Sequence, residues 1–306
     1  MAKVSILVPS RSEKYLRRTI EDVLLKAAGE IEVLPILDGA PPVEPLPESP
    51  LIKPLYFKKG IGLRAAVNAG VEVASGEFIL KLDGHCALAP GFDETLKASC
   101  DGDWVVVPRR YSLDVDTWAP WPHRPSVDYE YLLFPYRDLA KGTRLGNTWF
   151  ERRAERKGLA LDDDPCFQGS AYFFTKAHFQ RMGPYRPDLF TDFMLESEEL
   201  TNKTWLSGGR VVVNKMTWYA HLHKGSVHRR GYFLAAKTLR RGRYAHEQFW
   251  FCNDGWLPDW PARVHHYDWL IDKFDPMPGW PANWREHYQD HRWVGPLYLP
   301  GQEPAL

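Results

Sequence analysis

Short apolar runs alternate with segments of helical spacing along the N-terminal part of the chain. The runs "VSILVPS" (4–10) and "IEVLPILDGA" (31–40) end at turn-forming residues, as buried strands do. Between them, "YLRRTIEDVLLKAAG" (15–29) repeats apolar residues three or four positions apart and ends at a glycine, which predicts a helix. A second helix is predicted over 60–76 and a third strand over 77–85. This order predicts a parallel sheet with crossover helices.

The pattern is less regular farther along the chain. The segment 104–113 is strand-like, and 196–213 is typical of a helix closed by two glycines and followed by a strand. The tail, 247–306, holds seven of the thirteen Trp and shows no clear period. We therefore expect an α/β domain over 1–225, with halves of about 1–100 and 101–225, and a basic segment with an aromatic extension over 226–306.

Composition is that of a globular protein. The 306 residues are 44% hydrophobic, enough to bury a full core. No run of about 18 apolar residues occurs, and no signal-like segment precedes the first strand, so we expect no membrane contact and a cytoplasmic location. The four cysteines lie far apart without a CxxC pair, which argues against a zinc knuckle and a disulfide framework.

Two carboxylates fall where predicted strands end. Asp38 and Asp83 are both expected at the carboxyl edge of the sheet, where open α/β folds bind ligands. Asp83 and His85 have two interpretations: ordinary turn residues, or metal ligands on the same side of an extended strand end. Mixed oxygen and nitrogen ligands suit Mn²⁺, and His221 or His223, which leave a later strand, offer a third ligand.

Four blocks of the sequence resemble one enzyme family. "GLRAAVNAGVEVASGEFILKLDGHC" is similar to the helix and the DxD- or DxH-ending strand of GT-A glycosyltransferases, and is closest to the polypeptide N-acetylgalactosaminyltransferases and their family 2 relatives. "FQGSAYFFTKAHFQRMGPYRPDL", "ESEELTNKTWLSGGRVV" and "WYAHLHKG" resemble their acceptor block, their E-x-x-E helix and the position of their last metal-binding His. Over about residues 3–225 the resemblance implies a GT-A fold, a Rossmann-like, mostly parallel sheet with flanking helices, followed by the Trp/Pro-rich extension.

The resemblance also implies an activity and a cofactor. A sugar would move from a nucleotide-diphosphate sugar to a hydroxyl, with Mn²⁺ or Mg²⁺ held by Asp83, His85 and His221 and with His223 outside the ligand set. Such a metal neutralises the charge that grows on the pyrophosphate as the glycosidic bond breaks.

Three further residues match donor-binding positions of the family. Asp38 matches the Asp that contacts the nucleoside, and Arg64 matches the helix Arg that reaches the nucleotide side. Gly169 falls in the loop where the backbone approaches the sugar or the acceptor. Each also has a plainer interpretation, as a turn Asp, a solvated helix Arg and a turn glycine.

The group that takes the acceptor proton is left open. Glu196 aligns with the Glu of the family's E-D or E-N pair, but Ser197 stands where inverting members have an Asp base and retaining members an Asn. A serine cannot act as that base. Either Glu196 or Glu198 is the base, or the reaction retains configuration and the diphosphate itself accepts the proton. Glu199 is expected to pack or cap locally.

A strongly basic stretch follows. From residue 200 to 246 there are ten Lys or Arg and no Asp or Glu. Lys224, Arg229 and Arg230 are expected to close on the pyrophosphate. The surplus cations in 224–243 also indicate a second polyanion. The sequence also resembles stand-alone phage transferases, which makes a hydroxymethylated DNA base the leading acceptor. The DNA would be contacted by Arg229, Arg230, Arg240, Arg241 and Arg243. The aromatic residues of the tail would either stack on a flipped base or pack as a cover over the domain.

Other functions stay open at this point. The acceptor hydroxyl can belong to a glycan, a lipid-linked molecule or a protein. A non-catalytic module that binds a nucleotide sugar or nucleic acid is an alternative. A metal-dependent hydrolase or pyrophosphorylase on the same sheet is another.

Overall fold

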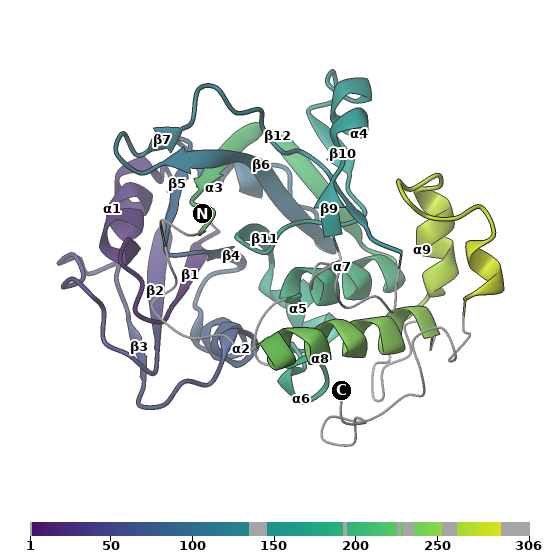
Figure 1. Ribbon diagram of the computed structural model, residues 1–306. Helices are drawn as coiled ribbons and strands as arrows, with labels where there is room; N and C mark the ends of the chain where they lie inside the picture. The colour runs from purple at the N-terminus through teal and green to yellow at the C-terminus, as the bar shows by residue number, and fades with distance from the viewer. Residues whose placement is uncertain are drawn as a thin grey trace.

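The structure is a computed structural model that describes residues 2–134, 146–191, 195–224, 228, 236–252 and 262–288; it leaves out the side chains of residues 236, 237, 239 and 240. Figure 1 shows a central sheet with helices packed around it. The strands are β1 (Val4–Ser10), β2 (Ile31–Asp38), β3 (Leu55–Phe57), β4 (Phe78–Leu82), β5 (Cys86–Leu88), β6 (Trp104–Asp114), β7 (Ala119–Pro120), β8 (Glu130–Leu132), β9 (Gly146–Thr148), β10 (Leu161–Asp163), β11 (Ala171–Thr175) and β12 (Arg210–His221). The helices are α1 (Leu16–Lys26), α2 (Leu63–Val73), α3 (Phe92–Lys97), α4 (Phe150–Glu155), α5 (Lys176–Met182), α6 (Pro187–Phe190), α7 (Glu196–Leu206), α8 (Ala236–His246), the π-helical turn η2 (Glu247–Cys252), α9 (Tyr267–Lys273) and the 3₁₀ turn η3 (Trp284–Glu286).

The sheet has two parallel parts joined by an antiparallel strand. Its main path runs β10-β12-β6-β11-β4-β1-β2-β3. The strands β3, β2, β1 and β4 are parallel to one another, and β6 is parallel to β12. The strand β11 is antiparallel to both β4 and β6, and β10 is antiparallel to β12. The predicted strand–helix–strand opening and the mostly parallel α/β sheet are confirmed.

Alternating residues of the central strands fill two apolar layers. In β1, Ile6 and Val8 belong to the cluster that includes α1, whereas Leu7 belongs to the cluster that includes α2. Successive side chains of a strand point to opposite faces, so an apolar run with no polar alternation can bury both faces. This is why "VSILVPS" forms a central strand.

The described part of the C-terminal region packs into the same core. Trp250 and Trp284 are each 2% exposed and belong to the apolar cluster that contains α2 and α7. Figure 1 shows α8 running alongside α7 and α6, with α9 at the edge of the molecule farthest from α1. For these aromatic residues, packing as a cover is therefore the observed role. The division of the chain at 225/226 stays a prediction.

The four cysteines are free, as the sequence predicts. Within the ranges given above, none of the helices combines the length and the apolar character needed to cross a membrane.

Candidate active site

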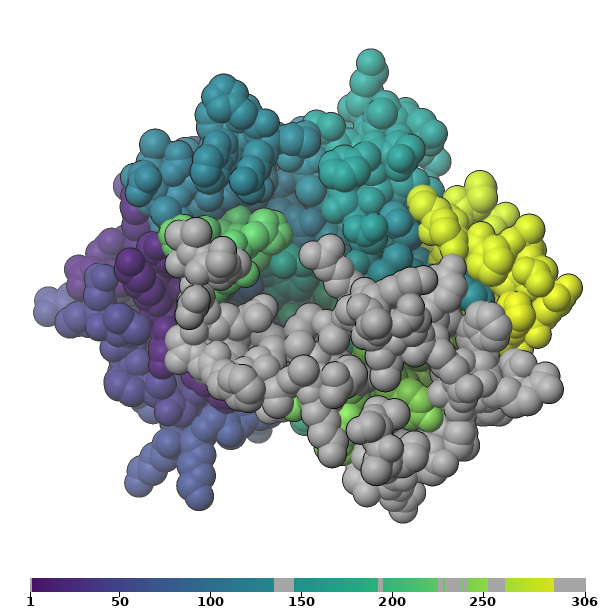
Figure 2. Space-filling model, in the orientation of Figure 1, coloured from purple at the N-terminus to yellow at the C-terminus, as the bar shows by residue number. Residues whose placement is uncertain are grey.

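A cavity of about 810 Å³ opens at the carboxyl ends of β1, β2 and β4. Its wall continues through β6, β8, β9 and the start of α7, so segments far apart in the sequence meet around it. Figure 2 shows the N-terminal segment, in purple and blue, and the teal segment that follows residue 146 on opposite sides of one face. We call the part around Asp83, His85 and His221 the metal half, and the part around Glu130, Glu196 and Glu198 the carboxylate half.

Three predicted ligands converge in the metal half. The Nε2 atom of His221 lies 3.0 Å from Nε2 of His85 and 3.4 Å from Oδ2 of Asp83, and that oxygen lies 3.8 Å from His85 Nε2. They form a group that could hold a metal ion. The side chains of Asp83 and His85 do not share one side of an extended strand end, because residues 84–85 form a turn between β4 and β5, as the other interpretation of the sequence allows. The turn, and the pairing of β5 with β12, bring the three side chains together.

The electrostatics keep Asp83 and His221 in their ligating forms. Desolvation raises the pKa of Asp83, but Lys81, whose Nζ donates to Oδ1 at 2.6 Å, and the two histidines hold it well below its ordinary value. Burial lowers the pKa of His221 to about 3, so its imidazole is neutral near pH 7. A carboxylate and neutral imidazoles are the forms that bind a divalent cation.

Glu13 sets the tautomer of His85. The Nδ1 of His85 donates to Glu13 Oε2 at 3.0 Å, and Lys224 donates to the same oxygen. A neutral imidazole has one N–H, so its Nε2 keeps a lone pair directed at Asp83 and His221. The Nε2 of His221, 3.0 Å away, can donate a hydrogen bond to this lone pair, and with its proton on Nδ1 instead it offers a second nitrogen ligand to a cation beside Asp83. The residues therefore fit a divalent metal with oxygen and nitrogen ligands.

Asp38 lines the cavity but is already engaged. Its carboxylate accepts the backbone N–H groups of Ile61, at 2.5 Å, and Gly62, at 3.2 Å, and it also pairs with Arg11. Asp38 thus fixes the loop that leads into α2. Its contact with a nucleoside stays a prediction.

The carboxylate half is built by the start of α7. A Cβ on Gly169 would lie 2.3 Å from Glu196 Oε1, so only glycine leaves room for this carboxylate. Burial raises the pKa of Glu196, although Lys81 lies 3.9 Å away and opposes the shift. Burial also raises the pKa of Glu198 to about 7, against a 2.9 Å hydrogen bond donated by Ser197. Both predicted candidates for the base therefore face the cavity, and Glu198 has a pKa near neutral pH.

A further ion pair lies in the same wall. Arg110 donates to Glu130 Oε1 at 2.6 Å. A Cβ on Gly146 would lie 3.4 Å from Glu130 Oε2 and 3.7 Å from Glu198 Oε1, so these two oxygens approach the same point of β9.

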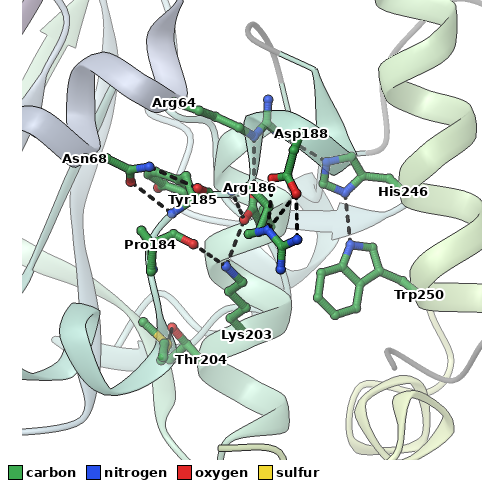
Figure 3. A network of polar contacts seen from close by, with 12 residues as sticks. Arg64, Asn68, Pro184, Tyr185, Arg186, Asp188, Lys203, Thr204, His246 and Trp250 are labelled. Carbon is green, nitrogen blue, oxygen red and sulfur yellow. Dashed lines mark hydrogen bonds and ion pairs between the residues drawn. The ribbon is translucent and has the colours of Figure 1, made fainter. Parts of the chain in front are cut away.

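The structure places Arg64 away from the cavity. Its side chain is 0% exposed, its Nε donates to Glu199 at 2.7 Å, and its Nη2 lies 3.2 Å from Nε2 of His246. Figure 3 shows Arg64 among the residues of α7 and α8, with Lys203 and Trp250 in the same network. This placement does not fit the predicted contact with the nucleotide. Glu199 pairs with Lys203 one turn along its own helix, as the expected local role requires, but it also pairs with the distant Arg64 of α2.

The basic stretch is only partly described. Arg229 and Arg230 lie outside the described residues, as does the side chain of Arg240. Arg243 is 3% exposed and donates to Glu247 at 2.8 Å, so its predicted place on a DNA-contacting surface is wrong. Lys224 lines the cavity and pairs with Glu13.

Sequence reasoning missed Glu13, Lys81 and Glu130. Two of them carry a signal in the sequence. Glu13 comes three residues after the end of β1, as His85 does after the end of β4. Lys81 is a charge inside an otherwise apolar strand, two residues before Asp83. Glu130 has no such signal, since its site depends on the distant residues Arg110 and Glu198.

A family model described as "Glycosyl transferase family 2" matches residues 5–167. The chain belongs to glycosyl transferase family 2. This confirms the predicted membership in that family of glycosyltransferases.

Curated relatives of this family 2 chain match a little over half of it. Polypeptide N-acetylgalactosaminyltransferase 15 of Homo sapiens is 27% identical over 183 residues, which cover 56% of the chain and 26% of the relative. Probable N-acetylgalactosaminyltransferase 8 of Caenorhabditis elegans is 26% identical over 185 residues, or 60% of the chain and 42% of the relative. The matches thus cover well under half of these longer proteins.

Solved structures confirm the GT-A fold of this family 2 member. GalNAc-T7 with UDP, GalNAc and Mn²⁺ superposes with a TM-score of 0.63 and 18% identity, over 81% of the chain and 49% of that structure. Staphylococcus aureus TarS 1-349 in complex with UDP-GlcNAc gives a TM-score of 0.52 and 15% identity, over 89% and 71%.

Proposed function

We propose that the chain is a metal-dependent transferase that moves a sugar from a nucleoside-diphosphate sugar to an acceptor hydroxyl. One observation carries the proposal: the cluster of Asp83, His85 and His221 shares a cavity with the buried carboxyls of Glu196 and Glu198. The first group suits a diphosphate with its metal, and the second suits an acceptor that must lose a proton.

Asp83, His85 and His221 would hold Mn²⁺ or Mg²⁺. Such an ion supplies Lewis-acid stabilisation of the negative charge that develops on the leaving diphosphate. Glu13 orients His85, and Lys81 keeps Asp83 ionised. Both roles prepare the ligands before any donor binds, as is usual for groups that surround metal ligands.

The transfer step balances in two ways. The acceptor oxygen forms a bond to the anomeric carbon while the bond from that carbon to the diphosphate oxygen breaks, and the electron pair leaves with the diphosphate. In an inverting reaction, Glu196 or Glu198 takes the hydroxyl proton. Glu198 has the pKa nearer to neutral pH, which suits a general base. In a retaining reaction, the departing diphosphate oxygen takes the proton and no carboxylate base is needed.

A hydroxymethylated DNA base of a phage genome is the most specific acceptor expected from the sequence. The many Lys and Arg residues of 224–243 favour a polyanionic acceptor such as DNA. The pairing of Lys224 with Glu13 and of Arg243 with Glu247 weakens that support, because each pair uses a cation that DNA would need. A glycan, lipid-linked or protein hydroxyl is therefore kept as the alternative.

Donor turnover tests the proposed function. The full chain is incubated with Mn²⁺ and a panel of nucleotide sugars. The panel begins with UDP-GalNAc and UDP-GlcNAc, because one structural neighbour contains UDP and GalNAc and the other contains UDP-GlcNAc. Release of nucleoside diphosphate is measured with and without a chelator. Metal-dependent release is expected. Release that chelator leaves unchanged would contradict the metal site. Binding of the donor without any turnover, whatever the acceptor, would favour the non-catalytic module.

A further inference from the structure

We propose that the carboxylate half selects an uncharged polyol, a sugar residue of a glycan, as the acceptor, and that Glu130 and Glu198 accept hydrogen bonds from its hydroxyl groups. The proposal rests on the glycosyl transfer proposed above and narrows its acceptor. It is argued from the geometry of these two carboxylates and from the ion pairs around the cavity.

The two carboxylates present oxygens to one space. Glu130 Oε2 and Glu198 Oε1 both lie within 3.7 Å of the point where a side chain on Gly146 would begin. The Sγ atom of Cys166 lies 2.9 Å from that point, so no side chain fits there, and the two carboxylates instead reach a ligand through the cavity that Glu130, Gly146 and Glu198 line. The neighbouring wall is polar, with Asn147, Thr148 and Gln168. Adjacent hydroxyl groups of a sugar each donate a hydrogen bond, which matches a wall of closely spaced acceptor oxygens.

A buried donor completes this set. Arg110 is 7% exposed and lines the cavity, and its Nε has no hydrogen-bond partner among the described residues, although Nη2 binds Glu130. A buried N–H without a partner is costly, and a ligand oxygen would satisfy it. A polyol oxygen both accepts and donates, so one sugar residue can serve the Arg110 and Glu130 pair together.

The ion pairs of the cavity argue against a polyanion. Among the described residues of the carboxylate half, Arg110 is the Lys or Arg that lines the cavity, and it is already paired with Glu130. A phosphate backbone in this half would have to break that pair or lie beside Glu130, Glu196 and Glu198. A buried carboxylate left without its cation is strongly destabilising.

The buried glutamates also argue against a cationic acceptor. Burial raises the pKa of both Glu196 and Glu198, so near neutral pH they carry less charge than two exposed carboxylates. Glu130 is neutralised by Arg110. The carboxylate half is therefore rich in hydrogen-bonding oxygens but low in net charge, which is the complement of an uncharged polyol.

Acceptor competition tests the proposal. With the donor that turns over best, the full chain is offered neutral p-nitrophenyl glycosides and neutral oligosaccharides, duplex DNA containing hydroxymethylcytosine, and an uncharged threonine-containing peptide. We expect transfer to a neutral glycoside at least tenfold faster than to the other two classes. Preferential transfer to DNA or to peptide would overturn the proposal.

Variants locate the selection. Glu130→Gln keeps an oxygen for Arg110 but removes the charge, and Asn147→Ala alters the exposed rim without touching an ion pair. Each is expected to raise the KM for the glycoside at least tenfold, with UDP affinity and donor hydrolysis changed less than twofold. Glu151→Gln, an exposed carboxylate of α4, is the matched control and should behave as the parent.

The outcomes separate the two proposals. Donor hydrolysis without transfer to any glycoside would overturn the acceptor proposal and leave the donor chemistry standing. Unchanged glycoside KM in both variants would place the acceptor elsewhere and also overturn it. Absence of turnover with every donor and acceptor would end the proposed function and this inference with it.

Discussion

Two carboxylates of the metal half and two of the carboxylate half have pKa values displaced in opposite directions. In the metal half, Asp83 and Glu13 are held below their ordinary values, because Lys81, Lys224 and the histidines outweigh desolvation. In the carboxylate half, burial outweighs the neighbouring cations and raises the values of Glu196 and Glu198. Carboxylates with pKa values separated in this way can serve as a fixed charge in one half and as a proton acceptor in the other.

The difference also has a topological origin. The metal half is made where parallel strands end, so each of its charges follows closely on an apolar run. The carboxylate half draws on β6, β8, β9 and α7, which are close in space and distant in sequence. Residues that follow apolar strands can be recognised in the sequence. The residues of the carboxylate half come together only in the folded chain, so the sequence does not show that they are neighbours.

Removing the proton acceptor is the strongest test of this division. If the reaction inverts, Glu198→Gln or Glu196→Gln should lower kcat about a hundredfold to ten-thousandfold, because a general base contributes that much. UDP affinity should stay unchanged, since the metal half is untouched. NMR of the product's anomeric configuration is the companion measurement. Retention together with two active Gln variants would show that the carboxylate half takes no proton.

Removing a metal ligand tests the other half. His221→Ala should lower metal-dependent kcat/KM a hundredfold or more, about 3 kcal/mol of lost charge stabilisation in the transition state. Mn²⁺ affinity, measured by electron paramagnetic resonance, should fall in parallel. His223→Ala is the matched control and should keep its Mn²⁺ affinity. Equal losses in both variants would mean that the ligand set is wrongly assigned.

The raised pKa of Glu198 predicts a pH-dependent stability. The value rises from 4.5 to about 7 on folding, so the folded state binds this proton more tightly. The associated stability is fully present below pH 4.5 and is lost as pH rises through 7, a change of about 3 kcal/mol. Urea unfolding across this pH window should show the decline in the parent and in Glu151→Gln, and much less of it in Glu198→Gln. Parallel curves for all three proteins would refute the shifted pKa.

The smallest expected effect concerns Glu13. Glu13→Gln replaces the carboxylate that orients His85, and such partners of metal ligands are typically worth about ten- to hundredfold in metal affinity. Calorimetric titration with Mn²⁺ measures the loss. Because the amide oxygen introduced by Glu13→Gln can still accept a hydrogen bond from His85, Glu13→Ala should lose more affinity than Glu13→Gln. If Glu13→Gln lost more affinity than Glu13→Ala, the proposed role of Glu13 in orienting His85 would be wrong.

The sequence predicts the first half of the fold and the metal half of the site well. The elements β1, α1, β2, α2 and β4 follow from periodicity, and Asp83, His85 and His221 meet as expected. The sequence leaves the turn at 84–85 undecided, because Asp and Gly suit both a turn and a strand end. Its conformation depends on the pairing of β5 with a strand more than a hundred residues later.

Charge composition is the least informative part of the sequence here. The acid-free stretch from 200 to 246 indicates an exposed cationic surface, yet Lys203 pairs with Glu199 and Arg243 with Glu247. Arg64 similarly pairs with Glu199, although its helical position is also compatible with solvent or nucleotide. Glu199 and Glu247 lie just outside the stretch whose charges are counted, and Arg64 is far from Glu199 in the sequence. A count of charges within one segment therefore misses these ion pairs.

The buried pair of Arg64 and Glu199 also fixes a spacing. It joins α2, whose preceding residue Gly62 lines the metal half, to α7, whose first residues line the carboxylate half. A sugar donor and its acceptor react quickly when held at a fixed separation, because the entropy of bringing them together has already been lost. By holding α2 and α7 together, the buried Arg64 helps to set the effective molarity of the two substrates. Loops at the acceptor side can then diverge in evolution without changing the separation between the two halves.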